Sequence, residues 1–262
     1  MKAKPKTVRA VRVNTGIEAA YRKRLDSLIS QMVKSVDYWV RAAYKNNTPE
    51  IDLAMDALPS QVMNKRLQEL TDRWVKRFED ESEKIAKEFV GKTQKYVDTS
   101  FQNALKDAGW SVAFKPTRAI KDAMNAAIYE NVSLIKSIPS QYMTDVEGIV
   151  MRGVTRGRDL SYITDELEKR YGITRRRAVL ISRDQSNKMT SVITNARRAE
   201  LGLYEAVWIH SGAGREPRPS HVKAGRDKLT FDIRVGAEID GERIFPGEAI
   251  NCRCSSKTVL PF

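Results

Sequence analysis

Apolar residues recur at helical spacing through most of the chain, and a strand-like spacing begins only toward its C-terminal end. Between residues 17 and 44, for instance, Leu25, Ile29 and Met32 fall along one face of a helix. A second stripe of the same kind follows Pro59, a residue suited to the first turn of a helix. The pattern predicts a series of long amphipathic helices, each of which buries one face.

Glycine and proline residues predict where the helices of the first half break. Gly91 is expected to interrupt or end the helix that starts at Pro59, and a third helix then spans about residues 92–108. The segment around Pro116 opens a fourth helix. Pro139 opens a short fifth one, because proline fits the first turn of a helix but not its interior.

A further pair of helices is predicted between residues 159 and 201. Gly172 is well placed to end the first of them in a left-handed conformation. Thr174 can then cap the second, which stops at Gly202.

After Gly202 the period of the pattern changes to that of strands. Residues 204–210 predict a strand, and residues 229–235 predict a weaker one. Residues 237–245 carry Asp-Gly in the position of a two-residue hairpin turn. The chain is therefore expected to end in a small region rich in strands and loops.

These elements predict a mainly α protein, in which a long helical N-terminal region precedes a small α+β C-terminal domain. We expect a basic flexible arm over residues 1–16 and a helical region over 17–147. The C-terminal domain then spans 148–262, with helices in 159–201 and a tail of strands and loops in 203–262.

The charge of the chain is strongly positive and unevenly distributed. Of a net charge of +13, residues 1–24 supply +7, with eight lysines and arginines against Glu18. Such an arm favours polyanionic partners, nucleic acid first, because bound phosphates release counterions. The alternative is a solvated tail that keeps the protein soluble.

The candidate contacts with nucleic acid are basic residues of the arm and of the helix after Gly172. On that helix, too, the arginines have the alternative of a solvated face. The set is Lys2, Lys4, Lys6, Arg9, Arg12, Arg175, Arg176 and Arg177.

A membrane role is not expected, because the chain has no run of about 18 apolar residues. The arm also lacks the apolar core of a signal peptide. We therefore expect the protein to be made and kept in a cytosol-like compartment.

The two histidines and two cysteines of the chain all lie between residues 210 and 254. His210, His221, Cys252 and Cys254 carry the imidazole and thiolate groups that zinc prefers, so zinc is the candidate cofactor. Their spacing, His-x10-His-x30-Cys-x-Cys, is not that of a well-known zinc finger. A disulfide between cysteines one residue apart would be strained, so free thiols or metal ligands are expected.

Other interpretations of this cluster stay open. In one, His221 hydrogen-bonds the backbone of its loop and the cysteines pack as small apolar residues. In another, Cys252 or Cys254 forms a hydrolase pair with His221, oriented by Asn251 or Asp227. A metal-dependent nuclease using His221 and Asn251 is a third. No constellation is specific enough to assign a catalytic residue, and we do not expect an enzyme.

Several short motifs of the C-terminal 40% of the chain resemble those of the phage Mu F-like minor head proteins, also called phage head morphogenesis proteins. The motif that carries most of this resemblance is Trp, Arg-Pro-Ser-His and Asn-Cys-Arg-Cys, formed by Trp208, Arg218, Pro219, Ser220, His221, Asn251, Cys252, Arg253 and Cys254. Further matching segments are Arg177-Ala178, Ile181-Ser182-Arg183-Asp184-Gln185, Arg197-Arg198-Ala199-Glu200-Leu201-Gly202 and Pro246-Gly247-Glu248-Ala249-Ile250.

The resemblance implies a minor component of a tailed-phage or prophage capsid, located at the portal vertex or in the head interior. Its implied partners are the portal protein, the major capsid or scaffold protein and the packaged double-stranded DNA, bound without sequence preference. During assembly the protein would be in the host cytoplasm. Some family members carry an attached toxin or transferase domain, and none is expected here, since the sequence ends at Phe262 soon after the motif.

Overall fold

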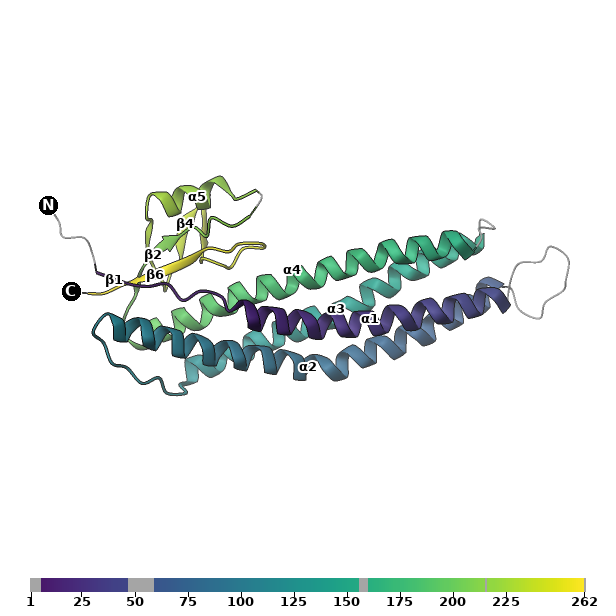
Figure 1. The fold of residues 1–262 in the computed structure, drawn as a ribbon, viewed down its shortest axis with the longest axis horizontal. Coiled ribbons are helices and arrows are strands. Elements are labelled where there is room, and N and C mark those ends of the chain that lie inside the picture. The colour runs from purple at the N-terminus through teal and green to yellow at the C-terminus, as the bar shows by residue number, and fades with distance from the viewer. Residues whose placement is uncertain (1–5, 47–58, 156–159, 215, 262) are drawn as a thin grey trace. The chain divides into compact units, whose positions relative to one another are not determined.

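The computed structural model of the chain describes residues 6–46, 59–155, 160–214 and 216–261, and the described part is dominated by long helices (Figure 1). About 70% of the chain is helical, so the prediction of a mainly α protein with a small strand-rich C-terminal part is confirmed. The helices are α1 (Thr15–Asn46), α2 (Pro59–Asp107), α3 (Arg118–Thr155), α4 (Leu160–Glu200) and the short α5 (Pro219–Arg226).

The strands form one sheet and one separate hairpin. They are β1 (Thr7–Val8), β2 (Glu205–Ile209), β3 (Thr230–Asp232), β4 (Ala237–Ile239), β5 (Glu242–Ile244) and β6 (Ser255–Val259). The sheet has the order β1-β6-β2-β3 with antiparallel neighbours, and β4 pairs with β5.

The described residues divide into two compact units that do not follow the order of the chain. One, here called the helical unit, consists of residues 21–86 and 130–179. The other, the sheet unit, consists of residues up to 20, residues 87–129 and residues from 180 onward. The boundary predicted from sequence at residues 147 and 148 lies inside α3.

The helical unit packs segments of α1 to α4 around an apolar interior. The stripe predicted for α1 is buried, with Leu25, Ile29 and Met32 fully enclosed. Polar contacts also join the helices: Tyr21 of α1 donates a hydrogen bond to Asn131 of α3. Apolar burial is therefore the main force here, with directional contacts that fix the register.

Three predicted helix breaks within the long helices are wrong. Gly91 lies inside α2, Pro139 inside α3 and Gly172 inside α4. The buried stripe continues in phase across each position; on α3, for example, Ile138 and Tyr142 flank Pro139 and are both buried. A glycine costs only about 1 kcal/mol in a helix and a proline about 3 kcal/mol, and burial of one continuous stripe outweighs these local costs.

The predicted strands are present, and the predicted hairpin turn is confirmed. Asp240 and Gly241 both have positive φ, 55° and 81°, as a two-residue turn between β4 and β5 requires. The sequence pattern missed α5, β6 and β1. Since β1 pairs with β6 and buries Val8, residues 7 and 8 belong to the sheet and not to a flexible arm.

The last turns of α4 carry two adjacent arginines that are both buried in the sheet unit. Arg197 donates a hydrogen bond to each carboxylate oxygen of Asp98 on α2, with nitrogen–oxygen distances of 2.7 and 2.8 Å. It also donates to Glu200 and to the backbone oxygen of Lys115. Burial alone would lower the pKa of Arg197, but the hydrogen bonds with Asp98 and Glu200 outweigh it and raise that pKa.

Arg198 faces the sheet and has no carboxylate among its hydrogen-bond acceptors. It donates to Thr258 Oγ1, to the side chain and backbone oxygens of Ser256, and to Asn195. Burial without a neutralising acid lowers its pKa to about 9. Four neutral acceptors thus stabilise this guanidinium group and attach β6 to α4.

Arg198→Lys tests this attachment. Lysine keeps the charge but lacks the planar fork, so several buried oxygens lose their donor. We expect the free energy of unfolding in urea to fall by about 2–3 kcal/mol. Arg176→Lys, on an exposed stretch of the same helix, is the matched control and should change it by less than about 0.5 kcal/mol. Equal effects of the two substitutions would contradict the role given to Arg198.

Candidate functional site

His221, Cys252 and Cys254 converge at one buried point of the sheet unit. The Nδ1 atom of His221 lies 3.5 Å from the Sγ atom of Cys252 and 3.8 Å from that of Cys254. The three candidate ligand atoms all lie within 4.8 Å of one another. The two cysteines form no disulfide, in line with the prediction of free thiols or metal ligands. The structure therefore brings together three of the four predicted zinc ligands.

Helix α5 positions His221. The helix starts after Arg218, whose backbone is extended, and Pro219 occupies its first turn. His221 follows on the buried face and packs edge-on against the Trp208 ring, with ring centroids 5.2 Å apart. Trp208 is fully buried in β2, so the imidazole is held against a rigid wall.

Gly225 lets α5 approach the end of β2. A Cβ atom at this position would lie 2.5 Å from His210 Cβ and 2.8 Å from the backbone nitrogen of His210. Such distances require the helix or the strand to shift. The absence of a side chain at Gly225 is therefore a condition for placing His221 beside the cysteines.

The loop that carries the cysteines is fixed by backbone contacts. Asn251 has a φ of 61°, the left-handed region that asparagine tolerates. Its backbone N–H donates to Asp184 Oδ1 of α4 at 2.8 Å, and Arg218 donates to the backbone oxygen of Ile250 at 3.0 Å. Partial burial raises the pKa of Asp184, and the hydrogen bond from Asn251 opposes that rise. The Asp184 contact places the loop before Cys252 relative to α4.

The two thiols lie close together, and one of them accepts a backbone N–H. Gly247 N–H points at Cys252 Sγ with a nitrogen–sulfur distance of 3.4 Å. The Cys254 thiol stabilises a neighbouring thiolate and lowers the pKa of Cys252 to about 5, while the shared proton and burial raise the pKa of Cys254.

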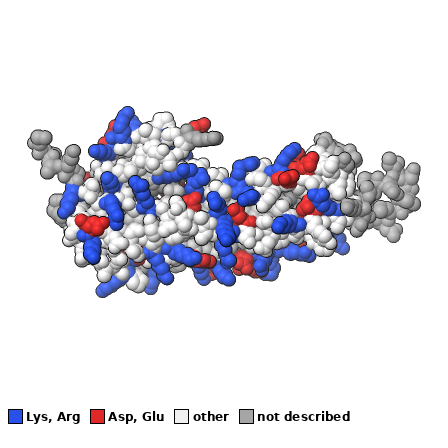
Figure 2. Space-filling view, viewed as in Figure 1, with Lys and Arg blue, Asp and Glu red and all other residues white. Residues whose placement is uncertain are grey.

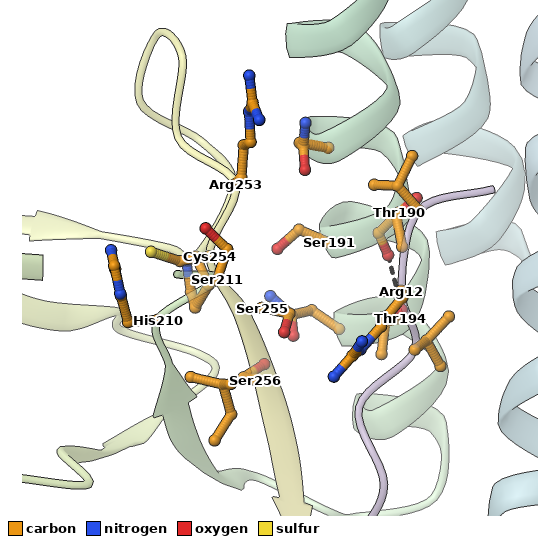
Figure 3. Close-up of a pocket in the computed structure, with 16 residues that line it drawn as sticks. Arg12, Thr190, Ser191, Thr194, His210, Ser211, Arg253, Cys254, Ser255 and Ser256 are labelled. Carbon is orange, nitrogen blue, oxygen red and sulfur yellow. Dashed lines mark hydrogen bonds between the residues drawn. The ribbon is translucent and has the colours of Figure 1, made fainter. Parts of the chain in front are cut away.

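His210, the fourth predicted ligand, lies outside this group. Its Nδ1 accepts a hydrogen bond from the Gly212 backbone N–H at 3.2 Å. It lines a cavity of about 230 Å³ together with Cys254. In Figure 3, α4 borders this cavity on the side opposite His210 and Cys254. From α4 the lining includes Thr190 and Ser191, and the remaining walls include Arg12, Arg253, Ser211 and Ser255.

The five basic residues of the N-terminal arm that were predicted to contact nucleic acid differ from one another in their contacts. Lys2 and Lys4 lie outside the described residues. Lys6 accepts a backbone hydrogen bond from Leu260, and Arg9 forms an ion pair of 3.4 Å with Asp107. Arg12 is exposed at the cavity described above.

On the helical unit, Arg175 and Arg176 are exposed, whereas Arg177 donates a hydrogen bond to Ser137. Lysine and arginine side chains are spread along the visible helices and interspersed with acids (Figure 2). Arg175 and Arg176 are thus the residues of this predicted set on the helical unit that remain best suited to reach a polyanion.

Asp227, one of the two residues proposed to orient a Cys/His nucleophile pair, is engaged elsewhere. Asp227 forms an ion pair with Arg226, with an oxygen–nitrogen distance of 2.9 Å. Asn251 is exposed and contributes its backbone to Asp184. His221 thus lies in a buried cluster with two thiols and the Trp208 indole ring.

Two residues that build the site were not singled out as site residues from the sequence. Asp184 belongs to one of the segments that resemble the family. The sequence did not predict that its carboxylate accepts a hydrogen bond from Asn251. Gly225 gave no signal beyond being a glycine, since its role depends on His210, which lies 15 residues earlier in the chain, just after β2.

The fold and the cluster together define a helical protein with a small sheet region that encloses a His/Cys site. Residues 144–257 match the model of the family described as Phage Mu protein F like protein, which confirms the resemblance predicted from the sequence. The matched segment runs from the end of α3 to β6 and contains both buried arginines and all three clustered ligands.

A curated protein of Haemophilus influenzae, described only as uncharacterized, is 28% identical over 99% of this chain. The chain spans 57% of the length of that relative. The similarity therefore extends beyond the family segment into the helices that precede it. No solved structure matches the chain. Among the described residues, none of the helices is apolar enough over a sufficient length to span a membrane.

Gly225→Ala tests how α5 places His221. The new methyl group overlaps the backbone of His210, and overpacking of this kind costs about 1–3 kcal/mol. We expect a lower Tm by circular dichroism and faster reaction of Cys252 and Cys254 with a thiol reagent.

Gly91→Ala is the matched control. Apart from the backbone of α2 itself, nothing lies within 4 Å of a Cβ atom at that position. It should leave thiol reactivity unchanged and raise stability by up to about 1 kcal/mol. If both variants behave alike, close approach at Gly225 is not what positions the site.

Proposed function

We propose that this protein is a minor head protein of a tailed bacteriophage or prophage, associated with the portal vertex and with head assembly. The observation that carries the proposal is the match of residues 144–257 to the Mu F-like family. That segment contains the buried cluster of His221 and the two cysteines. It also contains Arg197 and Arg198, through which α4 contacts α2 and β6. The family motif thus corresponds to the residues that build this part of the fold.

The helices give the protein a form suited to assembly. The partners we propose are the portal protein and the major capsid or scaffold protein. Helices α1 and α2 are 32 and 49 residues long and carry charged residues along their exposed faces. Long helical faces of this kind support docking on other proteins better than they support a substrate site. The proposed location is the virion, after assembly in the host cytoplasm.

We assign the protein a structural role and no catalytic one. What supports this is the environment of His221, where the neighbouring groups are thiols and an indole, and the engagement of Asp227 by Arg226. A general base needs a partner that orients it and an exposed substrate atom within reach.

Packaged double-stranded DNA is the proposed non-protein partner. Exposed Arg175 and Arg176, together with Arg12, supply positive charge for phosphates, and the net charge of +13 favours such contacts. Phosphate contacts of this type carry no sequence preference.

Head incorporation tests the assembly role. In the phage or prophage that encodes the protein, a nonsense mutation in its gene should produce defective heads, and wild-type heads should contain the protein when purified and probed by mass spectrometry. Expression of a chain without residues 1–145 should not restore incorporation, because it lacks the proposed docking helices. Normal, infectious heads that lack the protein would overturn the assignment.

Salt dependence tests the DNA contact. Binding to a random-sequence duplex should weaken linearly with log salt, and Arg175→Ala/Arg176→Ala should reduce the slope by about 1–2 if each arginine contacts one phosphate. The control is Lys76→Ala/Arg77→Ala, since these charges already face Asp80 and Glu81. A flat salt response of the unaltered protein, or equal effects of both double variants, would remove this contact from the proposal.

A further inference from the structure

The distances within the His/Cys cluster match those of ligands around one tetrahedral ion. Zinc–sulfur and zinc–nitrogen bonds of about 2.3 and 2.05 Å place nitrogen and sulfur ligands about 3.6 Å apart at a tetrahedral angle. His221 Nδ1 lies 3.5 and 3.8 Å from the two sulfur atoms. Small side-chain movements would suffice for all three atoms to bind a common ion.

We propose that His221, Cys252 and Cys254 bind a zinc ion through Nδ1 and the two Sγ atoms, with the fourth coordination position open to solvent. The site stabilises the sheet unit and is independent of the assembly role proposed above. One ligand comes from α5 and two come from the loop before β6. His221 precedes Cys252 by 31 residues and Cys254 by 33 residues.

The donor types select the ion. Two thiolates and one imidazole favour zinc over magnesium or calcium, which require oxygen ligands. The three side chains are all buried. Among the described residues the cluster contains no carboxylate, so its donors are two sulfur atoms and one nitrogen atom.

The surroundings of the sulfur atoms suit bound thiolates. The N–H group of Gly247 points at Cys252 Sγ, with a nitrogen–sulfur distance of 3.4 Å. Hydrogen bonds to metal ligands hold them in orientation and balance the negative charge that two thiolates bring.

The ligand-bearing segments are held by contacts that do not involve the cluster itself. Gly225 brings α5 against His210, and Asp184 fixes the loop at Asn251. The site is therefore built before an ion binds. Because the strands around it are only two to five residues long, an ion that joins α5 to β6 would add stability to a region with a small apolar core.

The open fourth position follows from where Cys254 lies. This residue lines the cavity of about 230 Å³, so the cavity reaches the edge of the cluster and can supply a water ligand. His210 lines the same cavity, but its Nδ1 is engaged by Gly212 and it stands outside the cluster. Water, and not His210, is therefore the expected fourth ligand.

The test is metal content of the full chain, purified under reducing conditions without a histidine tag, loaded with zinc and freed of excess. We expect one zinc per chain by elemental analysis and a higher Tm than that of the chelator-treated protein. Cobalt(II) in place of zinc should give the intense near-ultraviolet absorption of cobalt–thiolate bonds. A folded protein that takes up neither ion would overturn the proposal.

Variants separate the ligands from their neighbours. Cys254→Ser and His221→Asn should lose the zinc, whereas His210→Asn, the matched control at the other histidine, should retain it. Zinc retained in Cys254→Ser would show binding elsewhere and overturn the site. Loss of zinc in a folded His210→Asn protein would overturn the open fourth position. Should Cys254→Ser fail to fold, the cobalt spectrum of the unaltered protein decides whether thiolates bind the ion.

Discussion

The attachment of α4 to its surroundings through Arg197 and Arg198 is the constraint on which the sheet unit depends. Two adjacent residues on a helix project about 100° apart, so the pair reaches two different neighbours. Arg197 binds the carboxylate of Asp98 on α2, and Arg198 binds oxygens of Ser256 and Thr258 on β6. Both side chains are almost completely buried, about 1% exposed, where an unmatched donor would be costly.

The two arginines satisfy this constraint by different chemistry. Arg197 is neutralised by acids, and the net effect raises its pKa. Arg198 relies on neutral acceptors, and burial lowers its pKa to about 9. Once β6 is held by Arg198, the preceding loop with Cys252 and Cys254 has a fixed end. Within the sheet unit, the arginines therefore join α2, α4 and β6 beside the loop that carries the two cysteines.

The candidate metal site forms where three separate segments, namely β2, α5 and the loop before Cys252, approach one another. Trp208 of β2 forms the wall for His221, Gly225 sets how closely α5 approaches, and Asp184 holds the loop before the cysteines. Several of these residues fall in the segment that is similar to the Mu F-like family, so its motifs correspond to structural contacts as well as to the cluster. The family segment is thus one in which matching residues hold α4, α5 and the strands together.

The sequence by itself determined the long amphipathic helices, the strand at 204–210, the Asp240-Gly241 turn and the gathering of His and Cys residues near one end. Each of these is a local property, because periodicity and turn preference act over a few residues. Only the tertiary structure decided that the helices continue through Gly91, Pro139 and Gly172, since burial of a continuous stripe is a contact with distant residues. It also decided that His221 joins the cysteines while His210 does not, because that choice depends on packing between α5 and β2.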